Sequence, residues 1–487
     1  MSCTLNDEAL RFIKYVGFKL SCAEEQARLG WRLDYDRALR NYTELEALAK
    51  EKTEALKGHM PKVPKYAIYN KPKVIFKKDG TLSAHGEKWF QRLKEAKLSP
   101  TEQGPIKVVV SYDEPNPNSS DQVKNWLYTL GWKPQTFNYV RDKETGDERA
   151  IPQVRDDGEL CASVKKLAAQ DPAIELLDGL TVIQHRMAIF KGFIESASLR
   201  EDGTYWLKAE IGGFTNTMRF KHRKPLVNLP GVTAAYGDEI RGCLIAPGGQ
   251  FLVGSDMSSL EDNCKRHYIK PLDPEYVESM SEEGYDPHMK LLVIGGKITE
   301  DDYKFYVESK NNKEIDNDRF HTLDAMRKGA KTTTYSATYK VGKVKLARTA
   351  GISEKEAQEL LDAFWDLNWA VKKVEDNLYV KTLKDGSMWL KNPVSGFYYS
   401  LRTERDKFST LNQGTGVYCF DTWCMFMRKL GVGIVASFHD EVVVVSDDPD
   451  SIQEKLQKAI EMTNEKLQLN VPLGIDVQVG KAYSDVH

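Results

Sequence analysis

The sequence predicts a globular protein of two or three lobes that combines long helices with short strands. The chain has 487 residues, more than a single hydrophobic core usually supports. Apolar residues at helical spacing predict a helix at 35–57, and a largely helical stretch extends over about 266–380. Apolar runs bounded by glycine and proline predict short strands after residue 200, including one that ends at Asp256 and a pair within 434–445.

The composition argues against a membrane protein and against a disulfide framework. Hydrophobic residues make up 41% and charged residues 29% of the chain, and no apolar run approaches the ~18 residues of a membrane span. The first residues lack the apolar stretch of a secretory signal, so we expect a cytoplasmic protein. Seven cysteines without a Cys-x-x-Cys pair predict reduced thiols that carry no chemistry.

Charge is segregated along the chain although the net charge is only -2. Lysines with interleaved aromatic residues fill a stretch at about 57–105, where glycines and prolines predict a loop-rich insertion. A short strand is expected at 108–110, and helices are expected at 121–131 and 159–168. A lysine-rich stretch is most often a solvated face, but contact with DNA phosphates or with a partner protein is the alternative.

The first informative motif is the segment QFLVGSDMSSLEDN. Its apolar run at 251–253 predicts a strand that ends at Asp256. A strand that delivers an aspartate at its end can hold a metal ion rigidly, although an aspartate in this position can also cap a helix.

The second motif is GVGIVASFHDEVVVVSDD, in which two apolar runs flank His439, Asp440 and Glu441. The pattern predicts a β-hairpin with these charges at its bend. Hairpin bends favour polar residues, but this one lacks the glycine or asparagine that tight turns prefer. The charges therefore suggest a function, with a purely structural turn as the alternative.

The third motif is DAMRKGAKTTTYSATYKVG, where Arg327, Lys331, Tyr335 and Tyr339 follow one another at intervals of four residues. On a helix these side chains form one slightly spiralling stripe of two cations and two aromatic rings. Cations bind phosphates and rings stack on bases, so the stripe is typical of a nucleotide site.

Together the three segments resemble the family A DNA polymerases, in that family's order of first palm motif, fingers helix and second palm motif. The matching residues are 256–261 (DMSSLE), the stripe from Arg327 to Tyr339, and 439–441 (HDE). The resemblance extends to weaker segments: Gly30 and Asp34 at the start of the thumb, NPNSSDQ and LGWKP within it, TNTMRF as a primer-gripping motif, RTERDKFSTLNQGT before the second palm motif, and a terminal His487 that suggests a complete C-terminus.

The resemblance implies an α+β fold of the right-hand type, with an antiparallel palm sheet, helical fingers and a helical thumb. The expected boundaries are 1–205 for the thumb region with a basic loop-rich insertion at about 57–105, 206–265 for the first part of the palm, 266–395 for the fingers and 396–487 for the second part of the palm.

The resemblance also implies a role for individual residues in extending a DNA primer, paired with a template, by dNTPs. Asp256 and Asp440, with the backbone carbonyl of Met257, would hold two Mg²⁺ ions, and Lys331 would donate a proton to the departing pyrophosphate. The expected nucleotide-binding residues are Glu261, His288, Arg327, Lys331 and Tyr335. The expected DNA-binding residues are Arg219, Tyr339, Arg405, Gln413 and His439.

The sequence departs from the family pattern at several places. Met218 and Lys340 stand where the family usually has glycine, Ser409 stands where asparagine is usual, and 262–264 alter the end of the first palm motif. The stretch before Gly30 is too short for the proofreading exonuclease domain that usually precedes the polymerase, so we expect no exonuclease within this sequence. Editing is then done by another protein, is absent, or belongs to an N-terminal part that was removed. In phage relatives a basic insertion near the tip of the thumb recruits a processivity factor, so the insertion at about 57–105 is expected either to bind such a factor or to contact the duplex phosphates directly.

Two other classes of protein fit part of the pattern. A single-subunit RNA polymerase has a similar design, but Glu261 would occupy the space that a ribose hydroxyl needs. A non-catalytic scaffold that only binds primer and template would be expected to lose its metal site, whereas Asp256, Asp440 and Lys331 are all present. A viral-type reverse transcriptase would have Tyr-x-Asp-Asp at the hairpin in place of FHDE.

Overall fold

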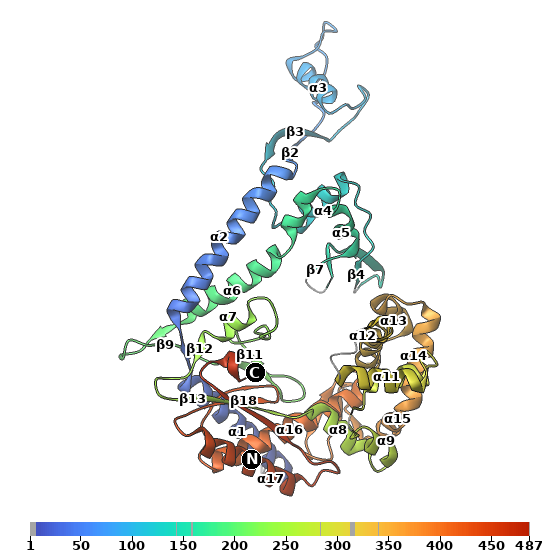
Figure 1. Ribbon diagram of the computed structural model, residues 1–487. Coiled ribbons are helices and arrows are strands. Elements are labelled where there is room, and N and C mark those ends of the chain that lie inside the picture. Colours follow the sequence, from blue (N-terminus) through green and yellow to red (C-terminus); the bar gives the residue numbers. More distant parts are fainter. Residues whose placement is uncertain are drawn as a thin grey trace. The chain divides into compact units, whose positions relative to one another are not determined.

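The computed structural model describes residues 6–142, 144–156, 159–282, 284–311, 317–338 and 340–486, without the side chains of Asn311 and Tyr335. The chain forms two compact units, one of residues 36–194 and one that combines the chain up to residue 35 with 195–487 (Figure 1). Within the described residues, no helix combines the length and the apolar character that crossing a bilayer requires.

Two long helices, α2 and α6, run through the smaller unit (Figure 1). The predicted helix at 35–57 corresponds to α2, and the helices expected at 121–131 and 159–168 correspond to α4 and, after a short strand, to α5. The elements of this unit are α2 (Tyr35–His59), β2 (Val63–Tyr69), α3 (Ala84–Glu95), β3 (Ile106–Asp113), α4 (Ser120–Thr129), β4 (Phe137–Arg141), β5 (Glu148–Pro152), β6 (Arg155–Asp156), β7 (Glu159–Leu160), α5 (Ala162–Ala168), η1 (Pro172–Leu177) and α6 (Leu180–Ser196).

The lysine-rich insertion has more regular structure than the loops that the sequence predicted. Strands β2 and β3 pair antiparallel as a two-stranded ribbon, and the side chain of Ser83 caps the start of α3. The buried side chains of Trp89 and Leu93 on α3 pack against Ile106 and Val108 of β3. The insertion therefore has a small hydrophobic core of its own.

The larger unit contains a four-stranded antiparallel sheet, which we name the central sheet, in the order β17-β18-β13-β19. The strand predicted to end at Asp256 is β13, and the predicted hairpin is β17 with β18. The strands and short helices of this unit are β1 (Trp31–Leu33), β8 (Ser198–Leu199), β9 (Tyr205–Leu207), β10 (Ile211–Phe214), β11 (Phe220–His222), α7 (Gly237–Arg241), β12 (Leu244–Ile245), β13 (Phe251–Met257), β14 (Val380–Thr382), β15 (Met388–Lys391), β16 (Tyr398–Leu401), η2 (Glu404–Asp406), β17 (Ile434–Phe438), β18 (Glu441–Ser446), β19 (Ile475–Gly480) and η3 (Tyr483–Asp485).

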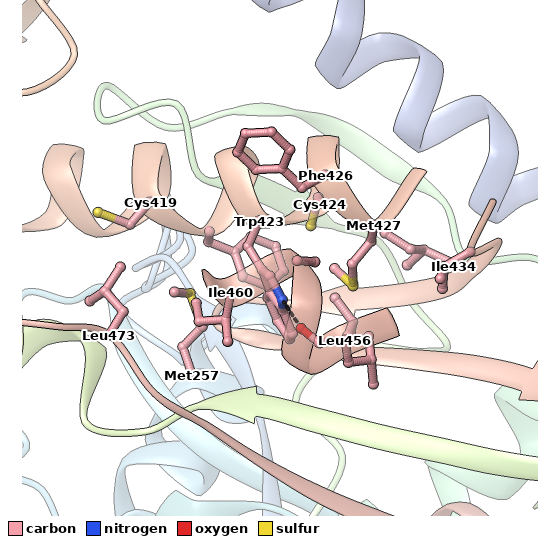
Figure 2. Close-up of a cluster of buried hydrophobic side chains, with 14 of the residues drawn as sticks. Met257, Cys419, Trp423, Cys424, Phe426, Met427, Ile434, Leu456, Ile460 and Leu473 are labelled. Carbon is pink, nitrogen blue, oxygen red and sulfur yellow. Dashed lines mark hydrogen bonds between the residues drawn. The ribbon is translucent and has the colours of Figure 1, made fainter. Parts of the chain in front are cut away.

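One face of the central sheet packs on two long helices. Val253 and Met257 of β13 and Val442 and Val444 of β18 lie in the same buried cluster as residues of α16 (Lys407–Lys429) and α17 (Pro449–Leu467). Within this cluster the indole nitrogen of the fully buried Trp423 donates a hydrogen bond to the carbonyl of Leu456, at 3.3 Å (Figure 2). Burial of these apolar side chains stabilises the sheet, since each contributes about 1.5–3 kcal/mol.

The stretch predicted to be helical is helical in the structure and forms two further apolar clusters. Its long middle helix, α12, carries Arg327, Lys331 and Tyr335 of the predicted stripe, and Tyr339 lies outside the described residues. A capping box formed by Ser353 and Glu356 starts α14. The helices of this region are α8 (Leu260–Ile269), α9 (Pro274–Ser279), α10 (Pro287–Ile294), α11 (Glu300–Asn311), α12 (Asp318–Thr338), α13 (Lys343–Ala350), α14 (Glu354–Leu367) and α15 (Trp369–Asp376).

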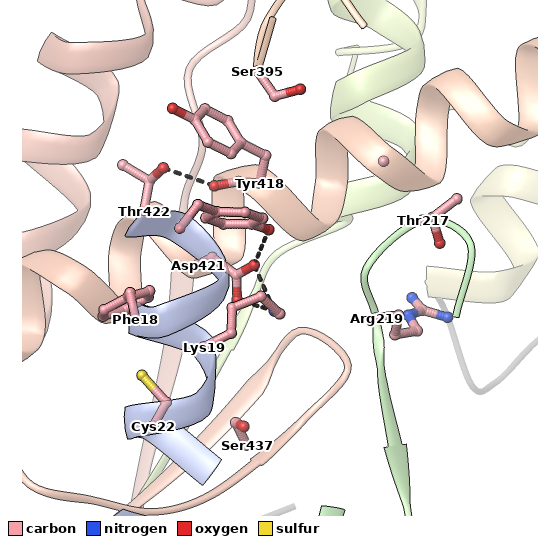
Figure 3. A network of polar contacts seen from close by, with 12 residues as sticks. Phe18, Lys19, Cys22, Thr217, Arg219, Ser395, Tyr418, Asp421, Thr422 and Ser437 are labelled. Carbon is pink, nitrogen blue, oxygen red and sulfur yellow. Dashed lines mark hydrogen bonds and ion pairs between the residues drawn. The ribbon is translucent and has the colours of Figure 1, made fainter. Parts of the chain in front are cut away.

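The first helix, α1 (Asp7–Leu29), belongs to the larger unit, which differs from the predicted boundary that places residues 1–205 in the thumb region. The buried ammonium of Lys19 contacts both carboxylate oxygens of Asp421 on α16, at 2.6 and 2.7 Å, and Tyr15 donates a hydrogen bond to the same carboxylate (Figure 3). The ring of Phe220 lies 4.3 Å from the Lys19 ammonium. The contacts with Asp421 join residues about 400 positions apart, which a local pattern does not reveal.

The pair of Lys19 and Asp421 yields a prediction about stability. Lys19→Met should lower the free energy of unfolding of the larger unit by about 3–5 kcal/mol, because it leaves the Asp421 carboxylate buried without its cation. Lys19→Met combined with Asp421→Leu should recover most of this loss. Urea unfolding followed by tryptophan fluorescence measures both effects, with Lys458→Met, which breaks an exposed pair, as the control. A loss no larger than that of the control would contradict the prediction.

Candidate active site

The functional face of the central sheet carries a row of three carboxylates on three neighbouring strands. In β13, Asp256 is the cross-strand partner of Glu441 in β18 and of Asp476 in β19. Cross-strand partners project to the same face of a sheet, so these carboxylates share the face opposite the packed helices. The apolar cores formed on the other face hold this arrangement in place.

Asp440 joins the row from the bend of the hairpin. His439 adopts a left-handed backbone conformation, with φ of 58°, directly before Asp440. The backbone N–H of Met257 donates a hydrogen bond to the carbonyl of Asp440, at 3.0 Å. This bond ties the bend to the end of β13 and therefore brings together the segments of all three predicted metal ligands.

The acidic side chains act on one another electrostatically. Burial raises the pKa of Asp256, and the charges of Asp476, Asp440 and Glu441 raise this pKa further. A bound cation would remove this repulsion, and carboxylate and carbonyl oxygens are the donors that Mg²⁺ prefers. Across the described part of the chain, no three His, Cys, Asp or Glu side chains converge closely enough to hold a metal ion by themselves. The carboxylates of Asp256 and Asp440 and the carbonyl of Met257 are oxygen donors whose chemistry fits Mg²⁺.

The carboxylate of Glu441, at the start of β18, is held by a tyrosine near the end of the chain. The hydroxyl of the buried Tyr483, in η3, donates a hydrogen bond to Oε2 of Glu441, at 3.1 Å. The guanidinium of Arg241 lies 4.6 Å from the Tyr483 ring and donates a hydrogen bond to the carbonyl of Pro230. A cavity of about 240 Å³ adjoins these groups, and its lining includes His222, Asp256, His439, Asp440 and Glu441.

Three of the residues expected to contact the primer or the nucleotide sugar lie close together. A terminal nitrogen of Arg219, in the loop between β10 and β11, lies 3.5 Å from a carboxylate oxygen of Glu261, at the start of α8. Burial lowers the pKa of His439, and the charge of Arg219 lowers it further. Gln413 lies on α16 and Arg405 in η2, and the described contacts do not join either residue to this group.

Two departures from the family pattern have a structural explanation. Met218 and Lys340, which stand in place of glycine, have φ of 67° and 53°, in the left-handed region where glycine has no steric cost. For other residues this conformation costs about 1–2 kcal/mol. The backbone at both positions therefore matches the glycine pattern, although the side chains do not.

A second group of predicted site residues lies among the helices. Nε of Arg327, on α12, donates to the carboxylate of Asp286, at 2.5 Å. Nδ1 of His288, on α10, lies 3.1 Å from the hydroxyl oxygen of Thr334 on α12. Burial lowers the pKa of His288; the charge of Asp286 opposes this effect, and Arg327 and Lys331 add to it. Arg327, His288 and Lys331 are therefore neighbours, as expected for one phosphate-binding group.

Some predictions fall outside the described residues, and some residues were not predicted. The side chain of Tyr335 and all of Tyr339 and His487 lie outside the description. The structure of the described part does not join the helical group to the carboxylate row by a direct contact. The sequence reasoning did not identify Asp476 or Asp286; the alternating strand GIDVQV and the Asp-Pro start of a helix were the available signals.

The fold is of the α+β right-hand class that is found in polymerases. The structure is similar to that of the POL domain of Pol1 from M. smegmatis, solved in complex with DNA primer-template and dNTP. The TM-score is 0.63, with 15% sequence identity over 96% of this chain and 70% of that chain. This likeness concerns the fold, and it confirms the predicted α+β right-hand class.

The sequence also matches the profile of DNA polymerase family A over residues 209–485. The chain belongs to DNA polymerase family A. It is 22% identical over 289 residues to DNA polymerase I of Bacillus caldotenax and 24% identical over 282 residues to the thermostable DNA polymerase I of Thermus filiformis. These matches cover 56% and 55% of this chain but 30% and 31% of the relatives, so the chain spans about a third of their length.

The raised pKa of Asp256 predicts that its charge destabilises the metal-free fold. The ionised carboxylate costs folding free energy above its raised pKa, and this cost vanishes below the ordinary value of 3.8, where the group is protonated in both states. In EDTA at pH 7, Asp256→Asn should raise the unfolding temperature by about 1–3 °C, a small gain because the side chain is partly exposed.

The gain should shrink as the pH is lowered toward 4. Asp447→Asn, an exposed aspartate after the same hairpin, is the matched control and should change little. Calorimetry at several pH values would contradict the interpretation if the two variants gave the same shift.

Proposed function

We propose that the chain is a template-directed DNA polymerase that extends a DNA primer with dNTPs. The observation that carries the proposal is the position of Asp256 and Asp440, held together at the end of β13 by the bond between Met257 and the Asp440 carbonyl. Membership in DNA polymerase family A and the fold of a polymerase domain support it.

Asp256 and Asp440, with the carbonyl of Met257, would hold two magnesium ions. Bound there, the ions would make the primer 3′-hydroxyl nucleophilic and stabilise the charge on the α-phosphoryl group. Glu441 is held in place by its hydrogen bond from Tyr483 and adds a third carboxylate beside these two. Its charge would strengthen the negative potential that attracts cations.

Arg327 and His288 are proposed to bind the β- and γ-phosphates of the incoming nucleotide, and Lys331 the α-phosphate side. Their proximity on α12 and α10 supports the assignment. Lys331 is exposed on α12 and is proposed to donate a proton to the departing pyrophosphate. The lowered pKa of His288 keeps its ring neutral near pH 7, so it would act as a hydrogen-bonding group.

Glu261 is proposed to close the space at C2′ of the sugar, and Tyr335 to stack near the sugar and base. The contact between Arg219 and Glu261 supports a common site for the primer end and the sugar. Arg219, Arg405, Gln413, Tyr339 and His439 are proposed to face the primer end and the new base pair. Hydrogen-bond acceptors in the minor groove occupy similar places in every correct pair, so donors there would test pair geometry.

The proposal predicts that the two aspartates are needed for catalysis but not for DNA binding. Asp256→Asn and Asp440→Asn should each lower primer extension by at least about a thousandfold, because the ions then lose a ligand. Affinity for the primer-template should stay within a few-fold, since phosphate contacts elsewhere supply it. Single-nucleotide extension and fluorescence anisotropy measure the two quantities, with Asp447→Asn as the control.

The same assay separates the proposal from its alternatives. Ribonucleotides offered in place of dNTPs should be poor substrates, whereas efficient ribonucleotide addition would favour an RNA polymerase. Binding of primer-template by wild-type protein without any extension in Mg²⁺ would favour a scaffold. Substantial turnover in either aspartate variant would refute the metal assignment.

We further propose that the ribbon of β2 and β3 binds an accessory protein that keeps the polymerase on its template. One face of the ribbon packs on α3, but Tyr66, Ile68 and Tyr112 on the opposite face are 55%, 63% and 62% exposed. Such a group of exposed apolar side chains is typical of a protein interface. Residues 57–105 contain eleven lysines and arginines but four acids, so the partner surface is expected to be apolar with acidic groups around it.

If this surface binds an accessory protein, the run length, which is the number of nucleotides added per binding event, should depend on that protein. Tyr66→Ser, Ile68→Ser and Tyr112→Ser combined should leave single-nucleotide addition and the run length of the protein alone unchanged. With an accessory protein from the same source, the run length should fall severalfold, because the apolar contact is lost. Lys65→Ala with Lys107→Ala is the control for DNA contact, which makes binding salt-dependent. A shortened run in the absence of any partner would point to DNA instead, and unchanged runs in both settings would indicate a solvated face.

A further inference from the structure

Asp286, directly before α10, is a buried carboxylate for which the proposed function has no role. Its side chain is only 7% exposed, and its two oxygens have different partners. One oxygen, Oδ1, accepts hydrogen bonds from the backbone N–H groups of His288 and Met289, at 3.0 and 3.1 Å. The other, Oδ2, accepts a hydrogen bond from Nε of Arg327, at 2.5 Å. One carboxylate therefore starts the helix that carries His288 and also holds the side chain of Arg327.

Asp286 binds the guanidinium of Arg327 through Nε, the nitrogen next to the aliphatic chain. Among the described residues, Asp286 is the one hydrogen-bond partner of this group, and the bond is made through Nε. Burial alone would lower the pKa of Arg327, but the hydrogen bond and charge of Asp286 outweigh it and raise the pKa. The two terminal nitrogens thus remain for a ligand, and an arginine presents such a pair to phosphate oxygens as a planar fork.

The surrounding charges favour an anionic ligand despite the buried carboxylate. The ammonium of Lys310 lies 4.0 Å from Asp286, and the charge of Lys331 acts on the neighbouring His288. The single negative charge of Asp286 is outnumbered by the positive charges of Arg327, Lys310 and Lys331. Asp286 can therefore hold Arg327 while the surroundings stay positive.

We propose that Asp286 is a positioning residue that orients Arg327 for the β- and γ-phosphates of the incoming nucleotide, and for pyrophosphate in the reverse reaction. The inference rests on the proposed function, which assigns Arg327 to these phosphates. Asp286 touches neither the phosphates nor the reacting atoms. Asp286 fixes the side chain of Arg327 before the nucleotide binds. Without it, Arg327 would lose rotamer freedom on binding, and this entropy cost would lower the affinity for the nucleotide.

The substitution Asp286→Asn separates the two functions of the carboxylate. Asparagine caps helices about as well as aspartate, so its oxygen can continue to accept from the two backbone N–H groups. Its amide nitrogen then faces Nε of Arg327, and two donors cannot form a hydrogen bond. The helix should therefore start as before, while the guanidinium loses its anchor.

The test is steady-state addition of a single nucleotide, together with pyrophosphorolysis. Asp286→Asn should raise the KM for dNTP and the KM for pyrophosphate by about tenfold each, with a smaller change in kcat. Primer-template affinity and the unfolding temperature should stay close to wild type. Asp324→Asn is the matched control. Asp324 lies on α12 with Arg327, and its charge also acts on Arg327, so its loss should shift either KM less than twofold.

A double-mutant cycle with Arg327→Ala distinguishes positioning from a general structural effect. In the Arg327→Ala background, Asp286→Asn should cause no further rise in the KM for dNTP, because the side chain that it orients is gone. An undiminished rise in that background would overturn the proposal. An unchanged KM for Asp286→Asn, when Arg327→Ala raises it, would also overturn it. If Arg327→Ala itself leaves both KM values unchanged, the assignment of Arg327 to the phosphates fails, and the positioning role fails with it.

Discussion

Strand β13 is hydrogen-bonded along both edges, and this pairing places Asp256 between Glu441 and Asp476. Like charges on cross-strand neighbours destabilise a sheet. Burial raises the pKa of Asp256, and these neighbouring charges raise it further. Burial of Val253 and Met257 on the other face offsets this cost. The same strand thus stabilises the fold through one face and concentrates negative charge on the other, which is the condition for attracting metal ions.

The hairpin that carries Asp440 depends on polar contacts from distant parts of the chain. The side-chain amide of Gln26, on α1, accepts from the backbone N–H of Ser437 at 3.0 Å and donates to its hydroxyl at 2.9 Å. It therefore satisfies the backbone N–H of Ser437 on β17, the end strand of the central sheet among the described residues. Tyr483 holds Glu441 from the other end of the chain. Such buried hydrogen bonds favour one geometry, because a displacement would leave their donors and acceptors unsatisfied.

Much of the candidate active site could be predicted from the sequence because its signals are local. An apolar run ending at Asp256, a hairpin around Asp440 and the four-residue spacing of Arg327, Lys331 and Tyr335 are each formed by residues close together in the sequence. Asp476 and Asp286 were missed because their importance comes from partners far away in the sequence. The position of α1 in the larger unit was missed for the same reason, because its Lys19 pairs with the distant Asp421. In the insertion, lysines and prolines concealed the alternating pattern of β2, so a ribbon was mistaken for loops.

The central claim is that Asp256 and Asp440 hold the metal ions of a nucleotidyl transfer site. A crystal structure with primer-template, a non-hydrolysable dNTP analogue and Mn²⁺ in place of Mg²⁺ would test it directly through the anomalous signal of manganese. The account predicts two peaks, each about 2.0–2.3 Å from carboxylate oxygens of Asp256 and Asp440, with the Met257 carbonyl as a further ligand of one of them. Manganese bound by other residues, with neither aspartate among its ligands, would contradict the account.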